Sequence, residues 1–191
     1  MILDYWRLLE EQDSEKLAQL PFRLALDLSE ERRMQVLILL EHLRDKTNYF
    51  TSPASRKHHH AFIGGLLRHS LEVVALAQHL AIALRIGLTY DQVVTCGLFH
   101  DLGKVGRYQM SNGEWKHSEQ DHLLSVPICS LVIVSKYTYL TQKEAFAILY
   151  HDGLYLPENQ YLANKETPLY LILHTADMWS GRKFGELEIS S

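Results

Sequence analysis

Apolar residues recur along most of the chain at intervals of three and four positions, which is the spacing of one face of an α-helix. Seven stretches follow this pattern: about residues 3–20, 30–48, 62–86, 89–103, 120–137 and 141–153, and a last stretch beginning at Thr167-Pro168. We therefore predict an all-α fold, a bundle of about seven helices with one small β-hairpin.

Local residues predict where several of these helices begin and end. Pro21 is expected to end the first helix, Ser29 to cap the second, and Gly87 to occupy the glycine position after the third. The runs 89–92 and 141–144 are capping boxes, in which the first side chain and the fourth each bond the other's backbone N–H.

The period changes between residues 107 and 116, where polar and apolar residues alternate around Asn112-Gly113. This dipeptide between alternating strands is the strongest short hairpin signal. Pro127 either bends the helix that follows or marks its true start. Residues 154–166 lack a clear period and are predicted to form a loop.

The composition fits an ordinary globular chain. The 191 residues are 47% hydrophobic and 22% charged, and the net charge is −4, which disfavours a protein that coats nucleic acid by bulk charge. Cys96 and Cys129 form no disulfide framework, and we find neither a signal peptide nor an apolar run of membrane-spanning length. These features predict a cytoplasmic protein with no membrane partner.

Eleven histidines are present, and most fall between His58 and His174. Two of them, and two aspartates, stand in or at the ends of apolar helical stretches: His69, His100, Asp101 and Asp177. Any one of these could be a helix cap or a histidine bonded to a backbone carbonyl. Together they predict a metal site, since buried charged aspartates need partners and helical bundles build metal sites this way.

The order H…HD…D resembles the HD-domain superfamily of metal-dependent phosphohydrolases. The HD pair stands in FHDLGK, whose Leu-Gly-Lys tail is typical of that family. The segment PASRKHHHAFIGGLLRHSLEV resembles the HD domains of bacterial 3′-to-5′ exoribonucleases and of conjugative relaxases. The resemblance implies an HD domain over residues 51–185, preceded by an N-terminal helical pair over residues 1–50 that packs on the core.

The resemblance also implies the metal ligands. His69, His100, Asp101 and Asp177 would hold one cation, and Asp101 would bridge to a second cation held by His122 and His151, unless these two are surface residues. Asp152 is expected to face the loop. With no cysteine in the set, the ligands suit Mn, Fe, Co or Ni, with Mg or Zn possible, at one or two ions per chain.

Positive residues flank the proposed ligands. Lys104 follows the HD pair and is the best candidate to bind a phosphate oxygen, although a lysine at a helix end can also complement the helix dipole. Arg56 and Lys57 precede a run of three histidines, 58–60, and Arg182-Lys183 follow the last helix. Arg56, Lys57 and Lys104 are the predicted substrate-binding residues.

The resulting hypothesis is hydrolysis of a phosphoester by a metal-activated hydroxide, with a nucleotide or short nucleic acid as substrate. Asp101, Lys104 and His60 are the predicted catalytic residues. The choice between monoester and diester, and the oligomeric state, stay open. Two alternatives remain: an HD-type di-iron oxygenase, and a metal-binding regulatory domain without turnover.

Overall fold

The structure is a computed structural model that describes residues 1–119, 122–153, 159 and 162–182. These residues contain eight α-helices, a single-turn 3-10 helix and one antiparallel strand pair, and so confirm the mostly-α fold. The elements are α1 (Tyr5–Glu10), α2 (Ser14–Leu26), α3 (Glu30–Lys46), α4 (Gly65–Ala83), α5 (Tyr90–Phe99), η1 (Leu102–Lys104), β1 (Tyr108–Ser111), β2 (Glu114–His117), α6 (Val126–Ser135), α7 (Gln142–Tyr150) and α8 (Pro168–Gly181).

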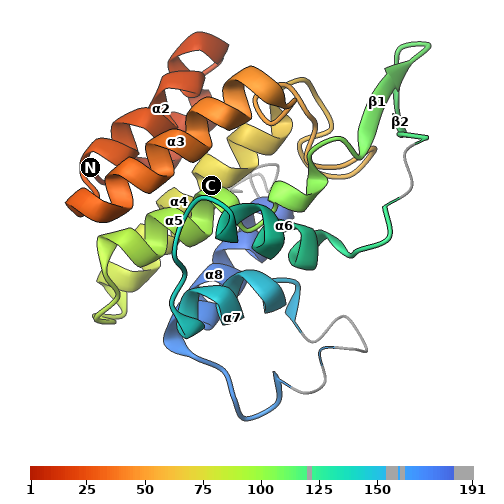
Figure 1. Cartoon of the computed structure of the whole chain (residues 1–191). Coiled ribbons are helices and arrows are strands. Elements are labelled where there is room, and N and C mark those ends of the chain that lie inside the picture. The colour runs from red at the N-terminus through yellow and green to blue at the C-terminus, as the bar shows by residue number, and fades with distance from the viewer. Residues whose placement is uncertain (120–121, 154–158, 160–161, 183–191) are drawn as a thin grey trace, which may run out of the picture.

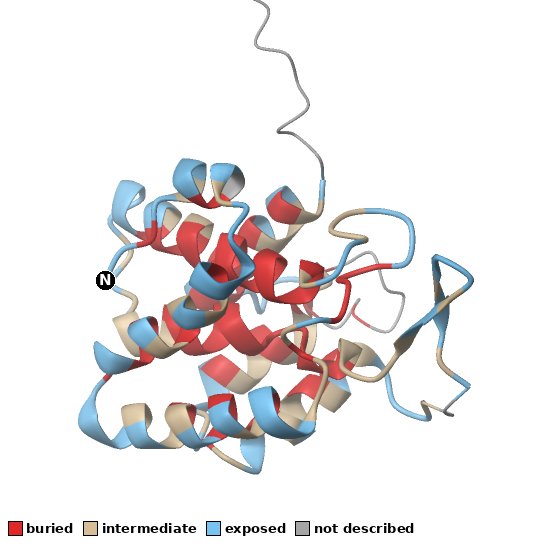
Figure 2. Cartoon of the chain, turned by 90° about the horizontal axis from the view of Figure 1, so that it is seen from above, coloured by how far each residue is buried: buried red, intermediate tan, exposed pale blue. Residues whose placement is uncertain are grey.

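Helix α4 is the centre of the bundle. It packs against α5 and α8, and also against α1 and α2, so α2 and α3 lie to one side of it and α7 and α8 to the other (Figure 1). The buried residues gather in the interior of the molecule (Figure 2), and most residues of α4 are buried. Within the described residues, no helix combines the length and the apolar character needed to cross a bilayer.

The first predicted helix is wrong, because residues 3–20 contain a break. Asp13 accepts hydrogen bonds from the N–H groups of Glu15 and Lys16, which begins α2 at Ser14. Pro21 does not end this helix but lies buried inside it. The capping carboxylate therefore decides where the helix begins, and the proline is tolerated because its ring packs in the core. Residues 1–50 hold three helices rather than a pair.

The helix observed in the third predicted stretch is shorter than the hydrophobic pattern over residues 62–86. Gly64 caps α4 with a φ of +81°, and the helix ends at Ala83. The residue with left-handed backbone after it is Arg85, at φ +53°, so Gly87 is not the helix-ending glycine. The apolar pattern continues beyond the helix because the residues that follow still pack on the core.

Both capping boxes form, at Thr89 before α5 and at Thr141 before α7. The hairpin is confirmed, with Asn112 and Gly113 at φ +54° and +79° between the paired strands. Helix α6 begins at Val126, so Pro127 marks its start and does not bend it. Of the predicted loop, residues 154–158 and 160–161 lie outside the described part of the chain.

Gly103 allows η1 to approach α6 closely. Its backbone N–H donates to the Ser130 hydroxyl at 2.8 Å, and a Cβ at this position would stand 2.1 Å from the Val126 carbonyl oxygen. This contact fixes the segment that follows the HD pair against α6.

We predict that Gly103→Ala lowers the free energy of unfolding by about 1–3 kcal/mol. The added methyl would collide with the backbone carbonyl of Val126, which cannot move aside as a flexible side chain could. Urea denaturation of the chelator-treated protein measures this. Gly87→Ala is the matched control, since a Cβ there meets nothing within 4 Å. Equal stability of the two variants would contradict the proposed close packing.

Candidate metal centre

Four of the predicted ligands meet in the middle of the bundle. Their ligand atoms all lie within 4.8 Å of one another, and the set is His69, His100, Asp101 and Asp177. His69 and His100 are fully buried, and Asp101 is 2% exposed. The structure thus brings together, from three distant stretches of the chain, the residues that the H…HD…D order indicates.

The fold places each of these side chains at a defined point. His69 lies one turn inside α4, the central helix. His100 is the residue after α5, and Asp101 precedes η1, so the HD pair occupies the turn between two helices. Asp177 lies on α8, which packs along α4.

The side chains converge on one point. His69 Nε2 lies 3.0 Å from Asp177 Oδ1 and 3.4 Å from Asp101 Oδ2. His100 Nε2 lies 3.5 Å from each of the same two carboxylate oxygens. The two Nε2 atoms are 3.3 Å from each other. Two imidazole nitrogens and two carboxylate oxygens therefore face a single small volume.

Backbone carbonyls set the tautomer of two histidines. His100 Nδ1 lies 3.0 Å from the Gly97 carbonyl oxygen, and His151 Nδ1 lies 2.8 Å from that of Ile148. A carbonyl only accepts hydrogen bonds, so each Nδ1 carries the proton. In the neutral ring the lone pair then lies on Nε2, which is the atom that faces the cluster.

The third histidine is oriented by side chains. His69 Nδ1 lies 2.9 Å from the Ser180 hydroxyl oxygen, and that hydroxyl donates to Glu72 Oε2 at 2.8 Å. Because the serine proton is committed to the carboxylate, the serine oxygen accepts from His69 Nδ1–H. His69 Nε2 therefore also presents a lone pair to the cluster.

This donor set fits a divalent cation. Imidazole nitrogens and carboxylate oxygens at these separations need positive charge between them. Burial lowers the pKa of His69 and His151, but the neighbouring carboxylates outweigh it and raise the pKa of both rings. Protons on these rings therefore supply that charge without an ion, and a divalent cation would displace them. All the donors are nitrogen and oxygen, which suits a hard or borderline divalent metal. Buried His and Asp groups that could hold a metal ion are therefore present.

The protonation of the carboxyl groups supports this fit. Burial raises the pKa of Asp101, but Lys104 and the surrounding imidazoles outweigh burial and hold it well below the usual range. Burial is likewise outweighed at Asp177, whose pKa is lowered by His100 and His69. Both carboxylates are therefore charged at neutral pH. Burial lowers the pKa of His151, but its contact with Asp101 prevails and raises it to about 9.

A second group of donors adjoins the first. Asp101 Oδ1 lies 3.4 Å from His151 Nε2, while Asp101 Oδ2 faces His69 and His100. His151, Asp152 and Asp177 form another set whose ligand atoms lie within 4.8 Å of one another. The Asp101 carboxylate therefore has one oxygen on each side, as a bridging ligand requires.

The position of Asp152 differs from the sequence-based expectation that it faces the loop. His151 is the residue after α7, and Gly153 follows at φ +70°, where an added Cβ would stand 2.4 Å from the His174 ring on α8. Asp152 lies in this turn, 3.7 Å from His151 Nε2 and in one group with Asp177.

His122 is not brought to the cluster. Its Nε2 lies 3.2 Å from the Ser118 hydroxyl oxygen, on the segment between β2 and α6. Among the described residues, none of the groups that could hold a metal includes His122. The interval between the HD pair and Asp177 contains the hairpin. His122 follows this hairpin along the chain and therefore lies away from the donor groups.

Lys104 lies beside the first group of donors. Its Nζ is 2.6 Å from Asp101 Oδ2, and its side chain is only 16% exposed, so it is not a solvated lysine at a helix end. Burial lowers its pKa, but the charge of Asp101 prevails and raises it. The ammonium group therefore stays charged next to the buried carboxylate.

A pocket of about 260 Å³ opens over the second group. It is lined by His59, Asp152, His174, Asp177, Met178, Gly181 and Arg182.

His60, the predicted catalytic histidine, is turned away from this pocket: its Nε2 contacts Glu72 Oε2 at 3.0 Å. Arg56 and Lys57 are exposed on the loop before α4, and Lys183 lies outside the described residues.

Four residues of the site escaped sequence reasoning. Asp152 and His174 carried a signal: the first completes a second His-Asp dipeptide, and the second precedes Asp177 by one helical turn. Glu72 and Ser180 carried none, since a serine that bonds a histidine 111 positions away leaves no local pattern.

The family model TraI_2, described as a putative helicase, matches residues 40–106. This segment covers about a third of the chain and contains His69, His100 and Asp101, but it ends before Asp177. Comparison with curated proteins and with solved structures gave no match. The similarity thus includes the first half of the candidate centre.

We predict that Asp101→Asn abolishes tight binding of Mn²⁺, because the variant loses the charge of Asp101, the more buried of the two carboxylates that lie against both groups. The double change Asp152→Ala and His151→Ala removes donors of the second group only, and should leave one ion per chain. Elemental analysis after equilibrium dialysis measures both.

His122→Ala is the control for the second position and should keep the metal content of the unmodified chain. Full occupancy in Asp101→Asn would contradict the assignment of the centre. Loss of one ion in His122→Ala would contradict the assignment of Asp152 in place of His122.

Proposed function

We propose that this chain is a metal-dependent phosphohydrolase that cleaves a phosphoester of a nucleotide or of a nucleic acid. One observation carries the proposal: carboxylates and imidazoles form two adjoining donor groups, and Asp152 and Asp177 of these groups line a pocket. Adjoining cation positions that share a carboxylate are the arrangement that phosphoryl transfer uses. The TraI_2 match over residues 40–106 supports a substrate related to nucleic acid.

Cations bound here would supply activation of a water molecule and neutralisation of the charge on the phosphate. The chain's own residues then have separate tasks. Asp101 keeps both cation positions together, and Asp152 and Asp177 face the pocket where the ester would lie. Arg182 lines the same pocket and Lys104 stands beside Asp101, so positive side chains accompany the acidic ones.

The pocket has room for a phosphate group beside Asp152 and Asp177, with a volume of about 260 Å³. Arg56 and Lys57 lie on the exposed loop before α4 and are available to a longer substrate.

The experiment is a product analysis with the Mn²⁺-loaded protein. Nucleoside monophosphates, cyclic nucleotides and short RNA and DNA strands are incubated with the unmodified chain and with Asp101→Asn, and products are identified by mass spectrometry. The proposal expects one class to be hydrolysed by the first protein and not by the second. If the metal is bound and no substrate class is hydrolysed, the proposal is contradicted. Iron-dependent oxygenation by the chain would then support the alternative of a di-iron oxygenase.

We predict two effects of Lys104→Met. Without metal, the free energy of unfolding should fall by about 1–3 kcal/mol, because a buried carboxylate loses its cationic partner. With Mn²⁺ bound, that loss should shrink, while substrate binding or turnover falls roughly tenfold to a hundredfold if the ammonium contacts phosphate. Thermal unfolding with and without chelator, together with steady-state kinetics, measures both.

Lys136→Met is the control, since Lys136 is an exposed lysine at the end of α6. It should change neither quantity. A Lys104→Met variant that loses stability equally with and without metal, and keeps normal kinetics, would show a purely structural lysine.

The loop charges distinguish the substrate classes. We predict that the double variant Arg56→Ala, Lys57→Ala weakens binding of an oligonucleotide and reduces its salt dependence, because exposed cations contribute by counterion release. Hydrolysis of a mononucleotide should be unchanged. Kinetics over a range of salt concentrations test this, and equal effects on both substrates would contradict a steering role.

A further inference from the structure

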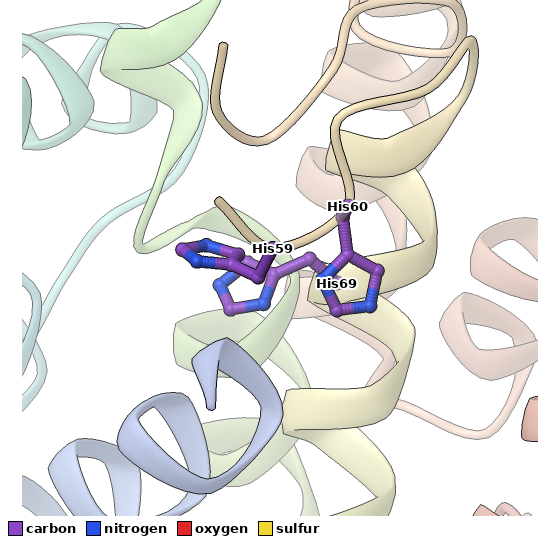
Figure 3. A group of neighbouring side chains, drawn as sticks. All are labelled: His59, His60 and His69. Atoms are coloured by element: carbon purple, nitrogen blue, oxygen red, sulfur yellow. The ribbon is translucent and has the colours of Figure 1, made fainter. Parts of the chain in front are cut away.

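Three histidine rings gather at the start of α4. His59 and His60 lie on the loop before the helix, and their ring centroids stand 5.1 and 5.4 Å from that of His69 (Figure 3). Their ligand atoms are close enough together to suggest a separate metal site.

The hydrogen bonds argue against a separate ion there. His69 Nδ1 is bonded to Ser180, and its Nε2 faces Asp177 and Asp101. His60 Nε2 is held by Glu72. His69 and His60 have therefore committed three of their nitrogens elsewhere. Two buried nitrogens of the trio have no hydrogen-bond partner among the described residues, His60 Nδ1 and His59 Nε2, and only His59 lines the pocket.

His59 differs from His60 and His69 in that it lines the pocket and its Nε2, which is buried, has no hydrogen-bond partner among the residues that the structure describes. The ring lies over His69 and near Gly181, and it lines the same pocket as Asp152 and Asp177. A buried polar nitrogen without a partner is costly, so its partner is expected to arrive with whatever fills the pocket.

His59 also stands outside the donor sphere of the first cation position. It shares a group with His69 but not with His100, Asp101 and Asp177. Two ligands of one ion lie at most about 4.2 Å apart, twice a metal–nitrogen bond of about 2.1 Å. His59 is therefore placed to meet a molecule bound at the ion rather than the ion itself.

Hydrogen bonds and close packing fix the backbone of the loop that carries this ring. Ser55 Oγ donates to the His59 carbonyl oxygen at 2.7 Å and accepts from the His58 N–H at 3.0 Å. Gly65 permits the loop to lie on α4, since a Cβ there would stand 2.0 Å from the His60 carbonyl oxygen. These contacts hold the backbone that carries His59, so the loop itself needs little reorganisation when a ligand enters.

We propose that His59 donates a ring N–H hydrogen bond to a phosphate oxygen of the substrate, and that His59, not His60, is the functional histidine of this loop. The proposal rests on the proposed function, because it assumes a phosphate over the cations. A neutral imidazole always offers one N–H donor, and phosphate oxygens accept such bonds readily.

The test measures binding of inorganic phosphate to the Mn²⁺-loaded protein by titration calorimetry, with the metal content of each sample determined. His59→Ala should bind phosphate roughly tenfold to a hundredfold more weakly at unchanged metal content. His59→Gln retains an N–H donor and should recover part of the loss. His79→Ala, which removes an exposed imidazole from α4, should bind phosphate normally.

Two results would overturn the proposal: normal phosphate affinity in His59→Ala, or loss of metal from both His59 variants, which would make His59 a ligand. Phosphate binding is independent of turnover. If phosphate binding depends on His59 while the unmodified chain hydrolyses no ester, the proposed activity fails and the role of His59 in binding phosphate stands.

Discussion

The Asp101 carboxylate is the group on which the rest of this structure depends. It is 2% exposed, yet it remains charged, because positive or proton-bearing partners surround it. One oxygen faces His69, His100 and Lys104, and the other faces His151. A buried charge is tolerated only with such partners, so the ends of α5 and α7, η1 and the first turns of α4 meet at this point.

A chain of buried contacts connects this centre to the N-terminal helices. Glu72 accepts a hydrogen bond from Ser180, which orients His69, and Glu72 also pairs with Arg68 at 3.3 Å. The Arg68 guanidinium in turn donates to the carbonyl groups of Leu8 and Glu11, at the end of α1. The first helix is therefore tied to the residue that orients a candidate ligand.

The sequence predicted what depends on local pattern. The two capping boxes and the Asn112-Gly113 hairpin form as predicted, and His69, His100, Asp101 and Asp177 meet in one group that could hold a metal ion. It failed where distant segments decide. Pro21 lies buried inside a helix that it was expected to end, and Asp152 joins the donor residues in the turn where Gly153 packs closely on His174. His122 was misplaced because spacing does not reveal how far a hairpin projects.

The most direct test of the central claim, that these buried donors form a metal centre, is anomalous diffraction from a crystal of the chain grown with Mn²⁺. The account predicts a peak within bonding distance, about 2.0–2.3 Å, of His69 Nε2, His100 Nε2 and the facing oxygens of Asp101 and Asp177. It predicts a second peak beside His151, Asp152 and the other Asp101 oxygen. A map with no peak between these side chains, or with Lys104 still paired to Asp101 and manganese bound elsewhere, would contradict it.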